Sequence, residues 1–293
     1  MAYNLQDLAR TDIEDPIEPS IVNDVLSQPP FLPLPTALNI RDLGLLDSSP
    51  VSPGLVFSSG FISHLSATDQ EALTIKHGIK RIYDLRTKKE RERMPEPQVK
   101  DAEMIWVETE LNLKTEIADF AEDNGVTGYV SGYMGMLRTH KEAFGRVIKD
   151  IASNDDSGIL YHCTGKSSCL PNIAEPDLTF NVAGKDRTGI MSALLLSLAG
   201  ASDELIVHNY VLSRIGVEPA REVLMKALKM SCPPDVMYET PGFKAICSIK
   251  EEYMAAFLMA LRTEFGGVDG YCKEFVGMDE EQIERVRSRL RGL

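Results

Sequence analysis

The feature that most restricts the fold of this chain is a short apolar run that leads, through a polar segment, into a helix apolar on every face. Residues 158–161 (GILY) have the length and composition of a buried strand, and the Leu-rich segment 190–199 predicts a buried helix. A strand buried on both faces is typical of a parallel sheet covered by helices on both sides. Further strands are predicted at the apolar runs 55–57, 79–85 and 102–107.

Helical spacing of apolar residues accounts for much of the remaining chain. The segment 66–77 begins at Ser66, a favourable N-cap, and ends before a glycine. Longer periodic segments predict helices at 129–151, 204–214, 218–230, 249–265 and 280–291. Strands that alternate with helices predict an α/β fold with a central, mostly parallel sheet flanked by helices and a helical C-terminal third.

The N-terminal residues differ in composition from the rest. Residues 1–35 are acidic and rich in proline, so we expect a poorly ordered lead-in, followed by one domain over 36–293. This start is too acidic for a signal or transit peptide, and the chain has no apolar run of membrane-spanning length. We therefore expect a cytoplasmic protein without a membrane span. The net charge of −13 argues against nucleic acid as a partner.

The cysteines do not indicate a disulfide framework or a zinc site. There are 5 of them, none in a C-x-x-C pair. No cluster of metal-ligand residues is visible in the sequence, so we expect neither a metal nor another cofactor. The sequence leaves the oligomeric state open.

The chemistry is concentrated in a motif that an insertion divides. The chain reads His-Cys-Thr at 162–164, continues for eighteen residues over 165–182, and resumes as AGKDRTG at 183–189. Without the eighteen residues the sequence reads HCTAGKDRTG, with five residues between Cys163 and Arg187. A strand-to-helix turn of that length can direct its N–H groups and the positive end of the helix at one anion. Such a site would lower the pKa of the cysteine, and the arginine would bind two oxygens of a phosphate.

This arrangement suits nucleophilic attack on a phosphate ester. Cys163 would form a phosphocysteine, while Arg187 and the loop would bind the equatorial oxygens of the transition state. His162 either tunes the thiol through a hydrogen bond or is a buried structural histidine. The remaining residues expected in the phosphate-binding loop are Thr164, Ala183, Gly184, Lys185, Thr188 and Gly189.

An acid must also protonate the leaving alcohol, and several aspartates are candidates. Asp186 comes first because it lies inside the loop. Asp84, at the end of a predicted strand, comes second, although it could equally form a structural ion pair with Arg86. Asp119 and Asp123, in the polar loop before the 129–151 helix, come third.

The rebuilt loop closely resembles the signature of the protein-tyrosine-phosphatase superfamily. It is most similar to the tyrosine-phosphatase-like family, whose bacterial members include triple-specificity enzymes acting on phosphotyrosine, phosphoserine/threonine and phosphoinositides. Three other stretches resemble that family in order: NIRDLG at 39–44, FSSG at 57–60 and YDLRT at 83–87 with Glu90. Ser58 stands where the family usually has arginine. The resemblance implies the superfamily fold and phosphatase chemistry.

The resemblance leaves the substrate open among phosphotyrosine, phosphoserine/threonine and phosphoinositides. Lys185 adds a positive charge inside the loop. Its similarity to loops of lipid phosphatases implies that phosphoinositides are among the possible substrates.

We interpret the insert 165–182 as a translated intron, because eighteen codons are fifty-four nucleotides and preserve the reading frame. Gly-Lys-Ser at its start can be encoded with a splice-donor string, and Val182-Ala183 can contain an acceptor AG. Excision between these points leaves one alanine codon and restores HCTAGKDRTG. If the insert is instead translated, the alternative is a catalytically dead pseudophosphatase that binds a partner or a phosphorylated ligand.

Overall fold

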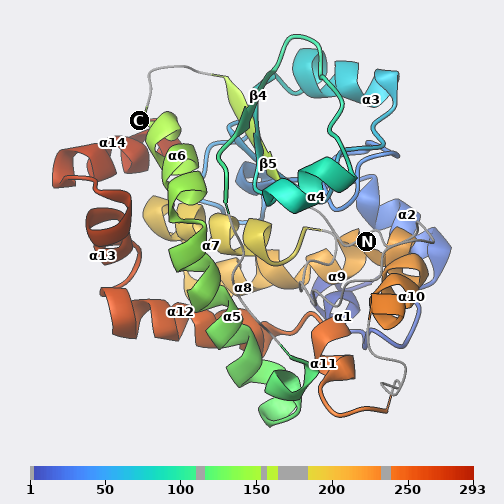
Figure 1. Cartoon of the computed structure of the whole chain (residues 1–293). Helices are drawn as coiled ribbons and strands as arrows, with labels where there is room; N and C mark the ends of the chain where they lie inside the picture. Colours follow the sequence, from blue (N-terminus) through green and yellow to red (C-terminus); the bar gives the residue numbers. More distant parts are fainter. Residues whose placement is uncertain (1–2, 110–115, 153–156, 164–183, 232–238) are drawn as a thin grey trace.

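The structure is a computed structural model, shown in Figure 1. It describes residues 3–109, 116–152, 157–163, 184–231 and 239–293. The insert 165–182 and the expected loop residues Thr164 and Ala183 lie outside this described part.

A single five-stranded sheet forms the centre of the molecule. Its strands lie in the order β1 (Arg41–Asp42), β2 (Val56–Ser59), β5 (Gly158–His162), β3 (Ile79–Asp84) and β4 (Glu103–Trp106). Strand β1 is antiparallel to β2, and all other neighbours are parallel. This topology confirms the predicted α/β fold with a mostly parallel sheet.

Strand β5 lies in the middle of the sheet and is buried on both faces. Ile159 and Tyr161 point into the larger apolar core, whereas Leu160 joins a smaller core with Phe57 and Ile82. This alternation is the period-2 pattern of a strand covered on both sides. His162 and Cys163 at its carboxyl end are also buried.

Helices cover the sheet and make up the C-terminal third, as predicted. They are α3 (Ala67–Glu71), α5 (Val126–Thr139), α6 (Lys141–Ile151), α7 (Arg187–Ala199), α8 (Asp203–Val211), α9 (Ser213–Gly216), α10 (Arg221–Ser231), α11 (Phe243–Cys247), α12 (Glu251–Phe265), α13 (Val268–Tyr271) and α14 (Glu280–Arg291). The buried helix α7 packs against α8, α14 and α5, and α12 packs on α5 and α8 (Figure 1). Ser66 caps α3, as expected from its sequence.

The predicted helix over 129–151 is divided in the structure. His140 lies between α5 and α6 with φ −105° and ψ 14°, outside the helical region. The hydroxyl of the preceding Thr139 donates to the backbone carbonyl of Gly135 at 3.1 Å, a side-chain bond to the backbone of the kind that bends helices. The apolar period continues across the break, which explains why sequence periodicity alone joins the two helices.

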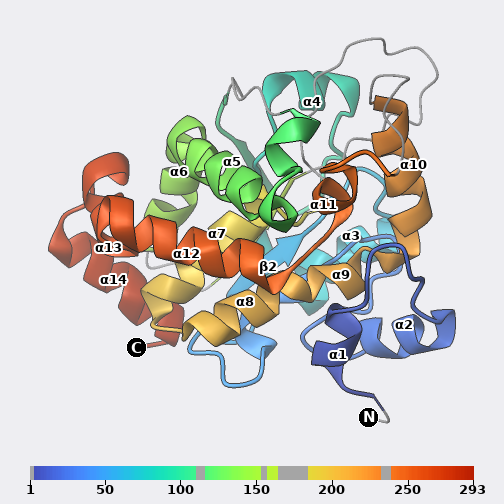
Figure 2. The ribbon, with the colours of Figure 1, turned by 90° about the horizontal axis from the view of Figure 1, so that it is seen from below.

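The N-terminal residues pack onto the domain, unlike the poorly ordered lead-in expected over 1–35. Helices α1 (Leu5–Ala9) and α2 (Pro19–Leu26) lie beside α9 (Figure 2). Buried Arg214 donates to the backbone carbonyls of Thr11 and Asp15 from the segment that joins the two helices. The composition of residues 1–35 does not predict this packing, because the contacts that hold the segment come from side chains some two hundred positions away.

Within the described ranges, no helix combines the length and the apolar character needed to span a bilayer.

Candidate functional site

Cys163 and Arg187 lie together at the carboxyl end of the central strand. Cys163 follows β5 directly, and Arg187 is the first residue of α7. The charge of Arg187 and the backbone N–H of Thr188 both act on the Cys163 thiol in the direction that lowers its pKa. The eighteen inserted residues therefore do not prevent the two ends of the divided motif from meeting.

Arg187 is fixed in a buried position by a bidentate ion pair with Glu90. Its Nη1 and Nη2 are each 2.7 Å from one carboxylate oxygen of Glu90, and Nη1 also donates to the carbonyl of Leu85 at 2.9 Å. Burial favours the neutral form of Glu90, but the charge and hydrogen bonds of Arg187 outweigh it and lower the pKa of this carboxyl. Glu90, which lies on another element, thus fixes the orientation of the planar guanidinium of Arg187.

Glu90 belongs to α4 (Lys88–Arg93), a charge run whose sequence predicts a solvated loop or helix end. That interpretation is wrong for Glu90, whose side chain is 11% exposed. Thr87 and Glu90 form a capping box at the start of α4, and the carboxylate that caps the helix also binds Arg187. The Thr-x-x-Glu spacing is a sequence signal for this helix start, but it does not reveal the arginine partner.

The thiol of Cys163 does not have the lowered pKa that the loop motif predicts. Complete burial raises the pKa, and the carboxylates of Glu90 and Asp186 raise it further. Arg187 and the N–H of Thr188 act in the opposite direction without overcoming burial. In this conformation the thiol is held in its neutral form, which is the less nucleophilic one.

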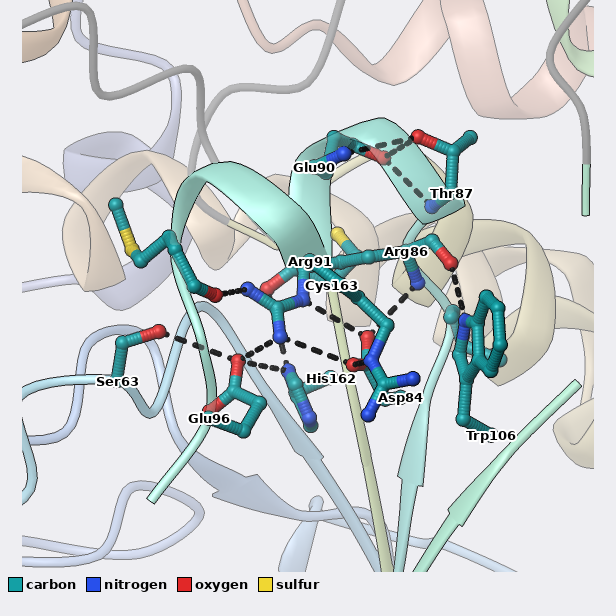
Figure 3. Close-up of polar contacts among 12 residues, drawn as sticks. Ser63, Asp84, Arg86, Thr87, Glu90, Arg91, Glu96, Trp106, His162 and Cys163 are labelled. Carbon is teal, nitrogen blue, oxygen red and sulfur yellow. Dashed lines mark hydrogen bonds and ion pairs between the residues drawn. The ribbon is translucent and has the colours of Figure 1, made fainter. Parts of the chain in front are cut away.

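Asp84 forms part of a buried ion-pair network beneath the site (Figure 3). Arg86 donates to Oδ1 through Nε and to Oδ2 through Nη2, both at 2.9 Å, and Nε of Arg91 lies 2.8 Å from the same Oδ2. Burial works to raise the pKa of Asp84, but His162 and Arg86 stabilise the charged form and the net pKa is lowered. A carboxylate held ionised in this way is poorly suited to donate a proton, so the geometry favours the structural reading of the Asp84–Arg86 pair.

Asp84, Glu96 and His162 could in principle hold a metal ion, since one ligand atom from each lies within 4.8 Å of the others. The guanidinium of Arg86 approaches two of them, however, at 2.9 Å from Asp84 and 2.5 Å from Glu96 (Figure 3). This cation already neutralises the carboxylates. The cluster therefore fits an ion-pair network better than a metal site.

His162 is fully buried at the end of β5. Its Nδ1 lies 3.4 Å from the carbonyl oxygen of Cys163 and 3.8 Å from the carboxylate of Glu96. The ring thus contacts the backbone beside the thiol and links it to the network around Arg86.

Asp186 and Lys185 extend into a polar network within the helical layer. One carboxylate oxygen of Asp186 accepts from Tyr133 Oη at 2.7 Å and from Lys185 Nζ at 2.9 Å. Its other oxygen has no partner in the described part of the chain. Lys185 also donates to Tyr129 Oη at 2.8 Å.

Gly184 and Gly189 are required by close backbone and ring contacts. Gly184 has φ +77°, and a Cβ there would lie 2.5 Å from the Cα of Gly60. The side chain of Asn39 donates to the Gly184 carbonyl at 3.1 Å. A Cβ on Gly189 would come within 3.1 Å of the Tyr210 ring. These contacts place the start of α7 against the sheet and α8.

The two third-rank aspartates are helix caps. Asp119 accepts from the N–H of Glu116 at 2.8 Å, and Asp123 accepts from both the N–H and the hydroxyl of Thr127. Both are exposed, and the Thr127 hydrogen bonds lower the pKa of Asp123. Their contacts explain them without a role in the site.

Comparison with known proteins agrees with this geometry. A family model described as "Tyrosine phosphatase family" matches residues 32–166 and 169–292, so the break falls between Cys163 and Arg187. A tyrosine-protein phosphatase of Nostoc commune is 27% identical over 78% of this chain and 71% of its own length. The triple specificity protein phosphatase PtpB of Mycobacterium tuberculosis is 25% identical over 88% of this chain and 98% of its own. The chain therefore belongs to the tyrosine phosphatase family and is a phosphatase hydrolase.

Proposed function

We propose that the enzyme hydrolyses phosphate monoesters through a phosphocysteine intermediate formed on Cys163. The sulfur attacks phosphorus, the P–S bond forms, and the P–O bond to the leaving alcohol breaks as that oxygen takes a proton. Water then attacks phosphorus, which releases phosphate and the free thiol group. Arg187 and the loop N–H groups bind the oxygens on which charge is spread in both steps.

The observation that carries this proposal is that Arg187 reaches the end of β5 beside Cys163. Leu85 connects them, since its N–H donates to the carbonyl of His162 at 2.9 Å and its carbonyl accepts from Arg187 at 2.9 Å. The site thus lies at the carboxyl end of the central parallel strand and the N-terminus of α7. Ligands of open α/β sheets bind at this edge, and helix N-termini favour anions.

We assign the acid and base steps to Asp186. Asp84 is excluded because arginines occupy both of its oxygens, and Asp119 because it is an exposed cap. Asp186 lies next to Arg187. One of its oxygens is held by Tyr133 and Lys185, and the other has no partner in the described residues. A carboxyl held in this way can give a proton to the leaving group and take one from water.

The substrates that we propose are phosphomonoesters, with phosphotyrosine first. The relatives are named as tyrosine-protein phosphatase and as triple specificity protein phosphatase, which supports phosphotyrosine and keeps phosphoserine/threonine open. We propose that the catalytic residues lie in one domain over residues 36–293, with the N-terminal residues packed on it.

We further propose that the working enzyme lacks residues 165–182. Removal of this segment gives the continuous-loop form, in which the chain reads HCTAGKDRTG. The raised pKa of the Cys163 thiol in the full chain supports this step, because a low-pKa thiolate needs the amide cradle that only the short loop can close.

The test compares p-nitrophenyl phosphate hydrolysis by the full chain and the continuous-loop form. We expect turnover by the continuous-loop form, none above background by the full chain, and complete loss in its Cys163→Ser variant. Equal activity of the two forms would contradict the role of the insert. A continuous-loop form with a reactive Cys163 but no activity on any phosphate ester would contradict the phosphatase mechanism.

A pseudophosphatase is the second candidate, and the neutral buried thiol of the full chain is the observation that favours it. Sequencing of the mature message across codons 160–190 separates the two. A message that joins Thr164 to a single alanine codon supports the active enzyme, whereas a dominant message that retains the insert supports the pseudophosphatase.

A further inference from the structure

Lys185 is the second cation of the phosphate-binding motif, and its sequence position suggests contact with substrate. In the structure its side chain is fully buried. Its ammonium group donates to Tyr129 Oη at 2.8 Å and to Asp186 at 2.9 Å, and it lies 4.5 Å from the centre of the Tyr129 ring. These contacts direct the charge into the helical layer formed by α5.

The partners of Lys185 are themselves fixed. Tyr129 stacks on Tyr253 with ring centres 4.0 Å apart, and its hydroxyl donates to the backbone carbonyl of Ile246 at 2.8 Å. Tyr133 donates to Asp186 at 2.7 Å and is 2.8 Å from the hydroxyl of Tyr210. Lysine, aspartate and tyrosines thus form one buried network that ends at the carboxylate assigned to acid–base catalysis.

We propose that Lys185 is a positioning residue for Asp186 and makes no contact with substrate. Its ammonium group is directed at Tyr129 and Asp186 in the helical layer, whereas Arg187 acts on the Cys163 thiol. Among the described loop residues 184–189, no second cation is then left for a neighbouring phosphate group. Phosphoinositides gain no preference over phosphotyrosine from Lys185, contrary to the implication of the loop sequence. The kinetic consequences of this inference rest on the proposed function, whereas the position of the Lys185 side chain does not.

The geometry is tested on the full chain by acylation of lysines with a water-soluble succinimidyl ester, followed by tryptic mass spectrometry. Lys88, whose side chain is 59% exposed, serves as the internal control. We expect Lys185 to react more than about tenfold more slowly than Lys88, because access requires local opening of the buried network. Equal rates would overturn the inference, whatever the catalytic activity of the chain.

The kinetic test uses the continuous-loop form with two substrates, a phosphotyrosine peptide and a short-chain phosphatidylinositol phosphate. In Lys185→Met we expect kcat to fall by about a hundredfold on both substrates, with KM little changed, because Asp186 loses its alignment. Tyr133→Phe, which removes another hydrogen bond to the same oxygen, should lower kcat on both by equal factors.

Loss of activity on the phosphoinositide alone would show that Lys185 contacts substrate and would overturn the proposal. The double variant Lys185→Met/Asp186→Asn leaves no unpaired buried charge and serves where the single variant fails to fold. It should lose no more activity than Asp186→Asn alone, because the two residues act as one unit. An inactive parent form would contradict the proposed function, while the acylation result would still decide the position of Lys185.

Discussion

At the scale of single residues, the position of Arg187 depends on a carboxylate from a different element. Arg187 and Glu90 form two hydrogen bonds of 2.7 Å in a buried setting. Removal of one partner from a buried pair leaves an uncompensated charge, which costs more than the pair itself contributes. The same pairing fixes the orientation of the guanidinium.

Glu90→Gln should therefore lower both stability and activity. We expect a loss of about 3 kcal/mol in the free energy of unfolding, measured by urea denaturation of the full chain. In the continuous-loop form, kcat/KM for p-nitrophenyl phosphate should fall by about a hundredfold because Arg187 is misaligned. Glu92→Gln, an exposed change on the same helix, is the control. Matching losses in the two variants would argue against a specific role for Glu90.

The pH dependence of this pair has a defined sign. The folded-state pKa of Glu90 is lowered, so its contribution to stability is fully present above the ordinary glutamate pKa and is lost as pH falls through the lowered value. The difference in unfolding free energy between wild type and Glu90→Gln should stay constant from neutral pH downward and shrink only below about pH 4. A difference that shrinks between pH 7 and 5 would contradict the assigned direction.

At the scale of elements, the site depends on the close approach of the α7 N-terminus to the sheet. Gly184 adopts φ +77° and lies where any Cβ would contact the backbone of Gly60 at 2.5 Å. Two separate effects therefore require glycine: the backbone conformation and the space.

Gly184→Ala should destabilise the protein more than the same change at a glycine that has a positive φ but free space around its Cβ position. Gly277 has φ +71° with nothing near its Cβ position, and Gly277→Ala should cost about 1 kcal/mol of unfolding free energy. Gly184→Ala should cost about 1–3 kcal/mol more, because the neighbouring backbone must move. Urea unfolding of both variants measures the difference, and equal costs would show that the loop relaxes without strain.

The elements that the sequence predicts well are those with strong periodicity. Strand β5 and helix α7 are apolar along most of their length, so the sequence alone predicts that both are buried. The break at His140 was missed because the apolar period continues across it. The two-residue strand β1 is too short for any period to show.

The site was predicted in part, because spacing carries only local information. Five residues between Cys163 and Arg187 in the rebuilt motif predict that they meet, and they do. The partner of Arg187 was missed, since Glu90 lies almost a hundred positions away within a charge run. The inward direction of Lys185 was also missed, because it depends on Tyr129 in a helix that spacing cannot position.

At the scale of the whole molecule, the N-terminal residues are joined to the catalytic domain by buried arginine contacts. Arg214 donates to the carbonyls of Thr11, Asp12 and Asp15 at 2.7 to 3.2 Å and pairs with Glu218. Apolar side chains such as Ile13 and Ile17 are buried in the same region. The N-terminal segment is thus part of the folded unit.

Arg214→Lys should weaken this attachment, since an ammonium group cannot reproduce three hydrogen bonds from one planar fork. We expect a loss of about 2 kcal/mol in unfolding free energy, together with faster amide exchange in residues 11–17 measured by hydrogen–deuterium exchange. The control is Arg262→Lys, which alters an exposed pair with Asp203 and should cost less than about 1 kcal/mol. Unchanged exchange in 11–17 would show that Arg214 does not hold the segment.

The two flanks of the divided motif are anchored by different parts of the molecule. His162 is held in the sheet ladder opposite Ser59 and Asp84, whereas the carbonyl of Gly184 is held by Asn39. Neither anchor involves the residues between them. For protein engineering, this makes the junction an entry point at which foreign peptide can be grafted while the scaffold keeps its fold. A ligand-responsive graft there would begin directly beside Cys163 and could couple binding of that ligand to the environment of the thiol.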